Sequence, residues 1–305
     1  MSTSGGVWGG RPPEEAERRD DDVLARDLAA DAGRRLLELR ARGGEPDLLR
    51  KAGDRLSHEF LTAALADRRP GDVVLSEEGA DDPARLTADR VWIVDPLDGT
   101  REFGEPGRTD WAVHVALWQR AGGGEVTAGA VALPALGHVL STTTSGEQHQ
   151  CSIGAAITTP MFHRVEGGAR SDGTGEHEET GGTAGTREGG GRTRIMVSRT
   201  RAPRFVRNIS DLIDAELVPL GSAGAKVAAV VCGEADAYVH AGGFYEWDTA
   251  APVAVARAAG CHASRIDGSP LAYNQANVRI PDILVCRPAL AGTLLQAIRE
   301  VTNAP

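Results

Sequence analysis

The most informative stretch of the sequence is Val91-Trp92-Ile93-Val94-Asp95-Pro96-Leu97-Asp98-Gly99-Thr100. Its apolar half predicts a buried strand that delivers Asp95 at its exit, where Pro96 and Gly99 predict a turn that ends the strand. Asp98 follows the turn, so both carboxylates can bind adjacent cations, and the Leu97 carbonyl between them offers another hard oxygen. Such oxygens are the ligands that Mg²⁺ prefers. Taken alone, two Asp residues at this spacing are more often a turn whose side chains cap a helix.

Acidic residues elsewhere in the chain stand at similar positions and favour a metal site. Glu77 and Glu78 follow the apolar run Val73-Val74-Leu75, which predicts another strand exit. Asp248 begins a predicted helix, and by itself it is explained as a cap. Strand-exit acids together with a helix-start acid are harder to explain as unrelated caps, so the sequence predicts one metal-binding cluster.

Apolar periodicity divides the chain into two halves. The segments at 23–40 and after Asp54 have the apolar spacing of helices, and the short apolar runs that follow them predict strands. The second half alternates strand and helix, so an α/β layered fold is expected. The expected parts are a flexible N-terminal tail (1–22), an N-terminal α+β domain with the metal site (23–165), a disordered Gly-rich loop (166–192) and a C-terminal α/β domain (193–305).

Composition excludes several classes of function. The chain has 305 residues and a net charge of −10, which disfavours nucleic acid as a partner. No run of about 18 apolar residues occurs, so no membrane span is expected, and residues 1–22 lack the apolar region of a secretory signal. The four cysteines are widely spaced and form no CxxC pair, so reduced thiols and a cytoplasmic protein are expected. The sequence does not decide the oligomeric state, and a homodimer stays open.

The acidic motifs resemble those of the inositol monophosphatase superfamily. Asp95-Pro-Leu-Asp-Gly-Thr100, followed by Arg101-Glu102-Phe103, resembles its first signature, and Glu246-Trp-Asp-Thr-Ala-Ala251 its second. Ser76-Glu-Glu78 and Ala52-Gly-Asp54 are similar to its accessory acidic segments, and the match runs from about residue 23 to the end. The resemblance implies a layered αβαβα fold with the metal site between the halves. It also implies a Mg²⁺-dependent, lithium-sensitive phosphoric monoester hydrolase.

The same resemblance assigns roles to residues. One Mg²⁺ ion would be held by Glu77, Asp95 and the Leu97 carbonyl, and a second by Asp95, Asp98 and Asp248. A third, weaker ion would lie near Glu77. By the same resemblance, Thr100 and Asp54 would orient the attacking water. The N–H groups of Gly99 and Thr100 would bind phosphate oxygens.

The substrate is expected to be a small phosphate monoester. Glu102 resembles the acid at this place in the CysQ branch, the 3′(2′),5′-bisphosphate nucleotidases. That branch removes the 3′-phosphate of 3′-phosphoadenosine 5′-phosphate, and it links the chain to sulfate assimilation. Further substrate-binding candidates, some by resemblance to the branch, are Arg101, Ser198, Arg199, Arg201, Lys226 and His240.

Several alternatives remain open at this point. Arg199 and Arg201 are equally explained as surface residues that aid solubility. His240 departs from the pattern of both branches, and the helix start before Lys226 lacks a serine of the branch. Inositol 1-phosphate and fructose 1,6-bisphosphate are alternative substrates. A metal or nucleotide sensor without activity is the non-enzyme alternative, which the complete acidic set disfavours.

Overall fold

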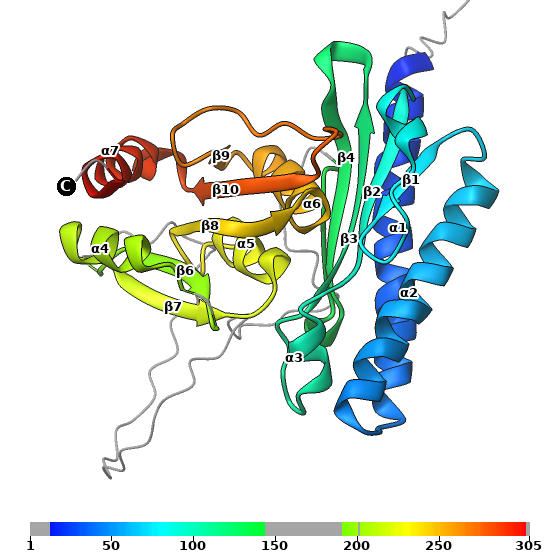
Figure 1. Cartoon of the computed structure of the whole chain (residues 1–305), viewed down its shortest axis with the longest axis horizontal. Helices are drawn as coiled ribbons and strands as arrows, with labels where there is room; N and C mark the ends of the chain where they lie inside the picture. The colour runs from blue at the N-terminus through cyan, green and yellow to red at the C-terminus, as the bar shows by residue number, and fades with distance from the viewer. Residues whose placement is uncertain (1–12, 144–190, 201, 303–305) are drawn as a thin grey trace, which may run out of the picture.

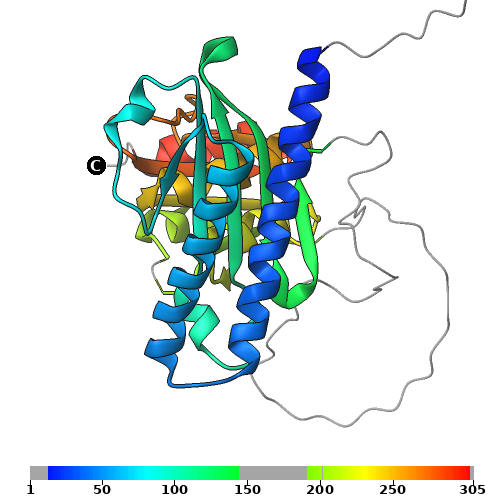
Figure 2. The same ribbon diagram turned by 90° about the vertical axis from the view of Figure 1, so that its right-hand side faces the viewer.

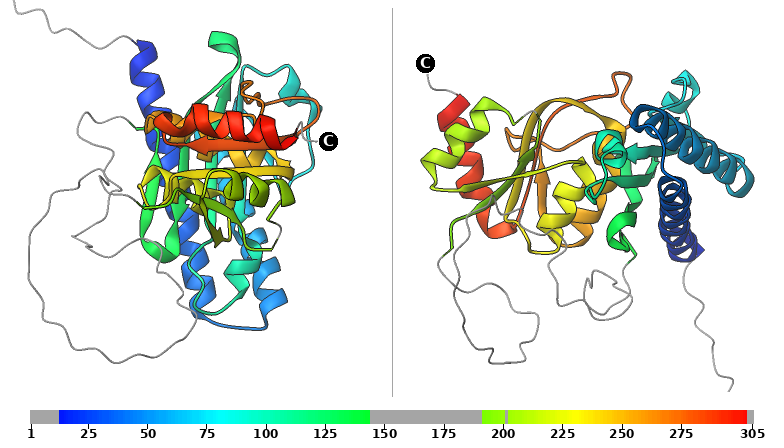
Figure 3. Two further views of the ribbon diagram at one scale, coloured as in Figure 1. Left: turned by 90° about the vertical axis from the view of Figure 1, so that its left-hand side faces the viewer. Right: turned by 90° about the horizontal axis from the view of Figure 1, so that it is seen from below.

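Five layers of helix and sheet make up the protein. The computed structural model describes residues 13–143, 191–200 and 202–302. In order, the layers are a helix pair, a five-stranded sheet, a second helix pair, another five-stranded sheet and a third helix pair (Figure 1). The view from below in Figure 3 shows the same succession. The αβαβα layering expected from the sequence is therefore confirmed.

The first sheet comes from the N-terminal half. Its strands lie side by side in chain order: β1 (Val73–Ser76), β2 (Arg90–Asp98), β3 (Ala112–Gln119), β4 (Glu125–Leu133) and β5 (His138–Ser141). Only β1 and β2 are parallel. Helices α1 (Pro13–Ala41) and α2 (Pro46–Arg68) cover its outer face, as Figure 2 shows. Helix α1 packs on it because Leu24, Leu28, Ala32 and Leu36 form one buried stripe, and α2 contributes buried Leu61 and Leu65.

The second sheet comes from the C-terminal half. Its spatial order is β7 (Glu216–Leu220), β6 (Arg194–Ser198), β8 (Ala237–Tyr245), β10 (Arg279–Cys286) and β9 (His262–Ser264). The outer helices are α4 (Arg204–Leu212) and α7 (Ala291–Thr302), and the helices between the sheets are α5 (Ala223–Val231) and α6 (Glu246–Ala258). Short helices are α3 (Thr100–Gly104), η1 (Pro83–Leu86), η2 (Ala121–Gly123), η3 (Pro134–Leu136) and η4 (Pro288–Leu290).

Apolar cores fill the spaces between the layers. One lies between α1, α2 and the first sheet, and another between the second sheet and the pair α4 and α7. The core that joins the two halves surrounds α5 and α6, whose Ala- and Val-rich sequences let both sheets approach closely. Because both halves contribute to this core, groups at the end of β2 and the start of α6 lie close together.

The structure corrects the predicted end of β2. The strand does not stop at Asp95 but continues to Asp98. Its pairing with β3 shifts between Asp95 and Asp98, so the strand has one extra residue there, as in a β-bulge. Pro96 lies inside this bulge, where it has no ladder hydrogen bond to donate. The bulge, rather than a turn, separates the two carboxylates.

The predicted start of the first helix is also wrong. Helix α1 begins at Pro13, not near residue 23, and Asp21 is buried within it. Asp21 is stable there because it accepts hydrogen bonds from Arg69 and Arg90. The tail prediction for residues 1–12 and most of the predicted Gly-rich loop lie outside the described residues.

Two further expectations can be compared with the structure. Cys261 and Cys286 are free thiols, but Cys232 is disulfide-bonded, which corrects the expectation of reduced cysteines throughout. Within the described ranges, none of the helices has the length and apolar character needed to cross a bilayer.

Candidate active site

The bulge in β2 places Asp95 at the centre of the site. Asp95 is 1% exposed, and its Oδ1 accepts a hydrogen bond from the Leu97 N–H at 3.0 Å. This short-range bond fixes the carboxylate against its own backbone. The other oxygen, Oδ2, is buried and has no hydrogen-bond partner. Such an unsatisfied buried carboxylate oxygen fits a bound cation, because a cation removes the cost of burying it.

Asp98 and Asp248 complete a compact carboxylate cluster with Asp95. One oxygen from each of the three side chains lies within 4.8 Å of the others. Asp248 is in the first turn of α6, where its Oδ2 accepts from the Tyr245 N–H at 2.6 Å. The cluster therefore joins the two halves of the chain, and it contains three of the predicted metal ligands.

Glu77 borders this cluster without belonging to its tightest part. It follows β1, and its N–H donates to the Val94 carbonyl at 3.3 Å. The residue as a whole is exposed, but its carboxyl group lies near those of Asp95 and Asp98. Loss of solvation raises the pKa of Glu77 to about 7. The nearby Asp95 side chain acts against this rise, and the charge of Asp98 adds to it.

The electrostatics of the cluster also fit a cation. Burial and the neighbouring carboxylates raise the pKa of Asp95 well above its usual value and that of Asp248 to about 7. Asp98 differs from both: burial acts to raise its pKa, but His114, Lys226 and the Gly224 N–H together lower it. Crowded carboxylates that resist ionisation without a counter-charge are the oxygen ligands expected of a divalent metal site.

Thr100 and Asp54 lie together, as predicted. The Thr100 hydroxyl is 3.2 Å from Asp54 Oδ1 and 3.0 Å from the Leu97 carbonyl oxygen, and both of these atoms accept. Burial and the charge of Glu78 raise the pKa of Asp54 to about 6. Gly99 precedes Thr100 with a φ of 85°, so the chain enters α3 through a left-handed residue. Thr100 is thereby held between α2 and the end of β2.

Two of the predicted arginines pair with Glu102 of α3 and with Glu105, the residue that follows this helix. Arg199 donates to Glu102 at 2.8 Å and to Glu105 at 2.9 Å, which connects the end of β6 with α3 across the two halves. Arg101 is exposed and pairs with Glu105 at 3.2 Å. Arg101 and Arg199, which were predicted to bind substrate, are therefore paired with carboxylates in this structure. Arg201 lies outside the described residues.

The remaining predicted substrate residues surround the start of α5. Lys226 is buried, and its ammonium group donates to the carbonyls of Gly221 and Ser222. Burial lowers the pKa of Lys226 to about 8, against the charges of Asp98 and other acids. His240 is buried on β8 and packs on Phe244 with 4.6 Å between ring centroids. Ser198 ends β6 and is half-buried.

The structure reveals His114 and Gly224 as site residues that the sequence reasoning missed. His114 Nε2 lies 3.2 Å from Asp98 Oδ2, and the Gly224 N–H donates to the same oxygen at 2.8 Å. A histidine inside the apolar segment Ala112–Gln119 was the available signal. Its proximity to Asp98 depends on the register that places His114 opposite Asp95, which one sequence does not specify.

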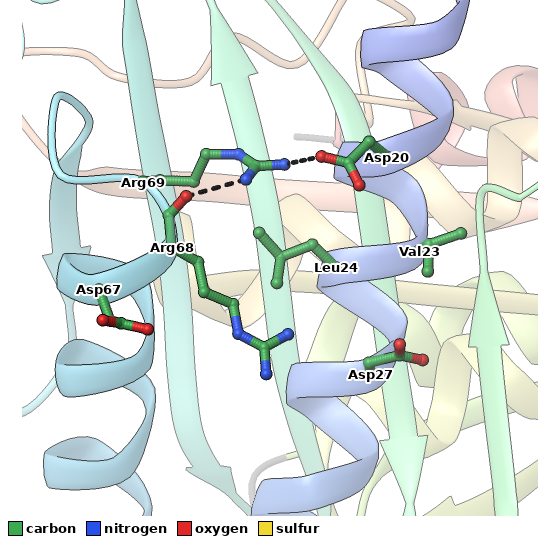
Figure 4. A pocket seen from close by; sticks show the side chains of 7 residues that line it. All are labelled: Asp20, Val23, Leu24, Asp27, Asp67, Arg68 and Arg69. Atoms are coloured by element: carbon green, nitrogen blue, oxygen red, sulfur yellow. Dashed lines mark hydrogen bonds and ion pairs between the residues drawn. The ribbon is translucent and has the colours of Figure 1, made fainter.

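A surface pocket lies elsewhere, between α1 and the end of α2. Its lining residues include Asp20, Leu24, Arg68 and Arg69 (Figure 4), and Arg69 pairs with Asp20. None of the predicted site residues lines this pocket. We therefore assign the chemistry to the carboxylate cluster.

Comparison with known proteins shows the family to which the whole chain is similar. The model of the inositol monophosphatase family matches residues 25–303. A Mycobacterium leprae protein named 3′-phosphoadenosine 5′-phosphate phosphatase is 48% identical over 289 residues, covering 92% of this chain and 94% of that protein. The inositol-1-monophosphatase SuhB of Mycobacterium tuberculosis is 31% identical over 250 residues, covering 80% and 76%. The crystal structure of CysQ from Bacteroides thetaiotaomicron has a TM-score of 0.66 at 26% identity, covering 88% and 97%.

Proposed function

The chain belongs to the inositol monophosphatase family and is a phosphatase, and from this premise we propose that it hydrolyses the 3′-phosphate of 3′-phosphoadenosine 5′-phosphate. The products are AMP and phosphate, and 3′-phosphoadenylyl sulfate is a second substrate of the same kind. The observation that carries this proposal is the 48% identity, over 92% of the chain, to a protein named for this activity. The link to sulfate assimilation belongs to the same proposal.

Magnesium is the proposed cofactor, with two to three ions. Asp95, Asp98 and Asp248 would hold them together with Glu77 and the Leu97 carbonyl, all hard oxygen donors. When bound, such ions offset the charge of the substrate phosphate and acidify a water molecule. The unpaired Oδ2 of Asp95 and the raised pKa of Asp248 support this proposal.

Thr100 and Asp54 are proposed to orient the attacking water. The Thr100 hydroxyl donates toward Asp54 or the Leu97 carbonyl, so its lone pairs are left to accept a hydrogen bond from the water. The water oxygen then forms a bond to phosphorus while the bond from phosphorus to the 3′-oxygen breaks. The attacking water gives up one proton to solvent and the 3′-oxygen takes one up from solvent water, so ester and water become alcohol and phosphate, and no covalent phosphoenzyme forms. The N–H groups of Gly99 and Thr100 are proposed to bind phosphate oxygens.

We propose that the second phosphate of the substrate lies near Ser198, Arg199, Arg201, Lys226 and His240. Arg199 carries a positive charge beside α3, but it is paired with Glu102 and Glu105. Binding a phosphate there requires Arg199 to exchange one carboxylate for the ligand, and exposed Arg101 lies on the same short helix. Release of Glu105 is the less costly exchange, because Glu102 is almost buried.

An inositol phosphatase is the second candidate, since the chain is 31% identical to a protein with that name. A non-enzymatic sensor is disfavoured because Asp54, Thr100 and the carboxylate cluster are all present and close together. We also propose that the protein is cytoplasmic and forms a homodimer; neither proposal rests on the active site. The ligand class is a small phosphate monoester.

The experiment that separates these functions is a comparison of kcat/KM. Phosphate release is measured with 3′-phosphoadenosine 5′-phosphate, inositol 1-phosphate and fructose 1,6-bisphosphate, with Mg²⁺ and with added Li⁺. Preference for the nucleotide together with inhibition by Li⁺ is expected. Preference for a sugar phosphate would overturn the substrate assignment. Nucleotide binding without phosphate release would instead indicate a sensor.

A further inference from the structure

We propose that His114 is a positioning residue that acts with Gly224 to fix the Asp98 carboxylate in the orientation from which it binds metal. The inference rests on the proposed metal site but goes beyond it, because neither residue is a ligand. Histidine is buried in many protein cores without such a role. The contacts of this ring distinguish it from a packing residue.

The His114 ring contacts both segments that carry the cluster. It is fully buried on β3, directly opposite Asp95 in the strand pairing. Its Nε2 lies 3.2 Å from Asp98 Oδ2, and its Nδ1 lies 3.9 Å from Asp95 Oδ2. The same Nδ1 is 3.1 Å from the carbonyl oxygen of Trp247, the residue before Asp248. The same ring therefore contacts both the bulge of β2 and the first turn of α6.

Gly224 holds the same oxygen of Asp98 from a different element. It lies in the first turn of α5, and its N–H donates to Asp98 Oδ2 at 2.8 Å. The positive end of the helix dipole points toward a carboxylate at this position. A Cβ atom at residue 224 would lie 2.2 Å from His114 Nε2 and 3.0 Å from Val131 Cγ1. Only glycine allows the ring and the helix start to approach Asp98 together.

This cradle removes rotational freedom from Asp98 before any metal binds. A carboxylate already held in its binding orientation loses less conformational entropy on coordination. Groups that orient metal ligands in this way typically contribute about 10- to 100-fold in metal affinity. Loss of the His114 contact is therefore expected to weaken Mg²⁺ binding, while excess Mg²⁺ restores turnover.

The test measures Mg²⁺ binding to the metal-stripped full-length protein by titration calorimetry, without substrate. His114→Leu fills the space but has no donor, whereas His114→Gln can place an amide N–H near the position of Nε2. We expect the Leu variant to bind Mg²⁺ about 10- to 100-fold more weakly and the Gln variant to stay close to the wild type. Gly224→Ala, which displaces the ring, should resemble the Leu variant.

His138→Leu is the matched control. His138 is also buried and lies in the same sheet, on β5, but it is paired opposite Leu133 and not a cluster residue. The Mg²⁺ affinity of the His138→Leu variant should equal that of the wild type. Circular dichroism and the melting temperature report whether each variant is folded.

Each outcome decides the proposal. Unchanged Mg²⁺ affinity in folded His114→Leu, or equal losses in the Leu and Gln variants, would overturn the positioning role. Failure of all three site variants to fold would also overturn it, because His114 and Gly224 would then be structural. If the wild type itself binds no Mg²⁺, the proposed metal site fails, and the inference fails with it.

Discussion

At the residue scale, the arrangement of Thr100 gives a direct test of how water is oriented. Thr100→Ala removes the hydroxyl that contacts Asp54 and the Leu97 carbonyl. Because positioned proton acceptors typically contribute about 10²- to 10⁴-fold, kcat should fall within that range. Mg²⁺ affinity should change little, since the hydroxyl is not a proposed ligand.

Thr100→Ser is the control, because serine keeps the hydroxyl and loses only a methyl group. It should retain most of the activity in steady-state phosphate release. Equal losses in the Ala and Ser variants would show that the methyl group, and therefore packing, matters at this position.

Lys226 gives a second test at this scale. Lys226→Ala should reduce kcat/KM for the bisphosphate nucleotide far more than for inositol 1-phosphate, because only the nucleotide carries a second phosphate. The structure offers a competing explanation: the ammonium group holds the Gly221 and Ser222 carbonyls, so its loss could disturb the start of α5. Similar losses on the two substrates would favour that structural role.

At the element scale, α1 is attached to the first sheet by a buried ion network. Asp21 accepts from Arg90 at 2.9 Å and from Arg69 at 3.0 Å, and Arg90 also pairs with Asp72. Removing one partner of a buried pair typically costs about 3–5 kcal/mol. Asp21→Asn should lower the free energy of unfolding by about 3 kcal/mol, the low end of that range, because Arg69 still pairs with Asp20 and Arg90 with Asp72.

The exposed pair of Arg26 and Asp27 on the same helix provides the comparison. Asp27→Asn should cost about 0–1 kcal/mol, as surface pairs do. Urea denaturation measures both variants. A loss in Asp21→Asn no larger than that in Asp27→Asn would mean that the network does not stabilise the fold.

The elements also show which structural features the sequence can predict. Apolar periodicity was sufficient for most helices and strands, because it reflects which face is buried. It was not sufficient for the start of α1 or the end of β2. Asp21 depends on arginines from α2 and β2, and Pro96 is accommodated by a bulge against β3. Both features depend on tertiary partners that local sequence does not specify.

At the scale of the whole molecule, the acidic cluster predicts how stability depends on pH. The folded pKa values of Glu77 and Asp248 are about 7, and that of Asp54 is about 6. In the unfolded chain these groups release their protons near pH 4, as ordinary carboxyl groups do. From about pH 4 to 7 the folded protein therefore holds more protons, so its stability falls as pH rises.

Mg²⁺ should reverse this loss, because it binds the ionised carboxylates. We expect the metal-free protein to melt at a lower temperature at pH 8 than at pH 5, and added Mg²⁺ to raise the melting temperature more at pH 8. Asp54→Asn should flatten the dependence near pH 6. An Mg²⁺ effect that is equal at both pH values would contradict the assignment.

The sequence does not predict those features of the site that depend on contacts between the two halves of the chain. Asp95, Asp98 and Asp248 could be identified from strand exits and a helix start, and the structure brings them together. His114 stands out in the sequence only as a polar residue in an apolar strand, because its role depends on strand register and on the approach of α5. The pairing of Arg199 with Glu102 and Glu105 likewise arises only when the halves pack. The boundary between the two halves stays a prediction.

The measurement that tests the central claim most directly is phosphate release from 3′-phosphoadenosine 5′-phosphate by metal-stripped protein as Mg²⁺ is restored. Asp98→Asn, which alters one member of the cluster, is measured alongside. We expect no release without Mg²⁺, a saturable return of release when Mg²⁺ is added, and severely reduced turnover in the variant. Release that persists without divalent ions, or near-normal turnover in Asp98→Asn, would contradict it.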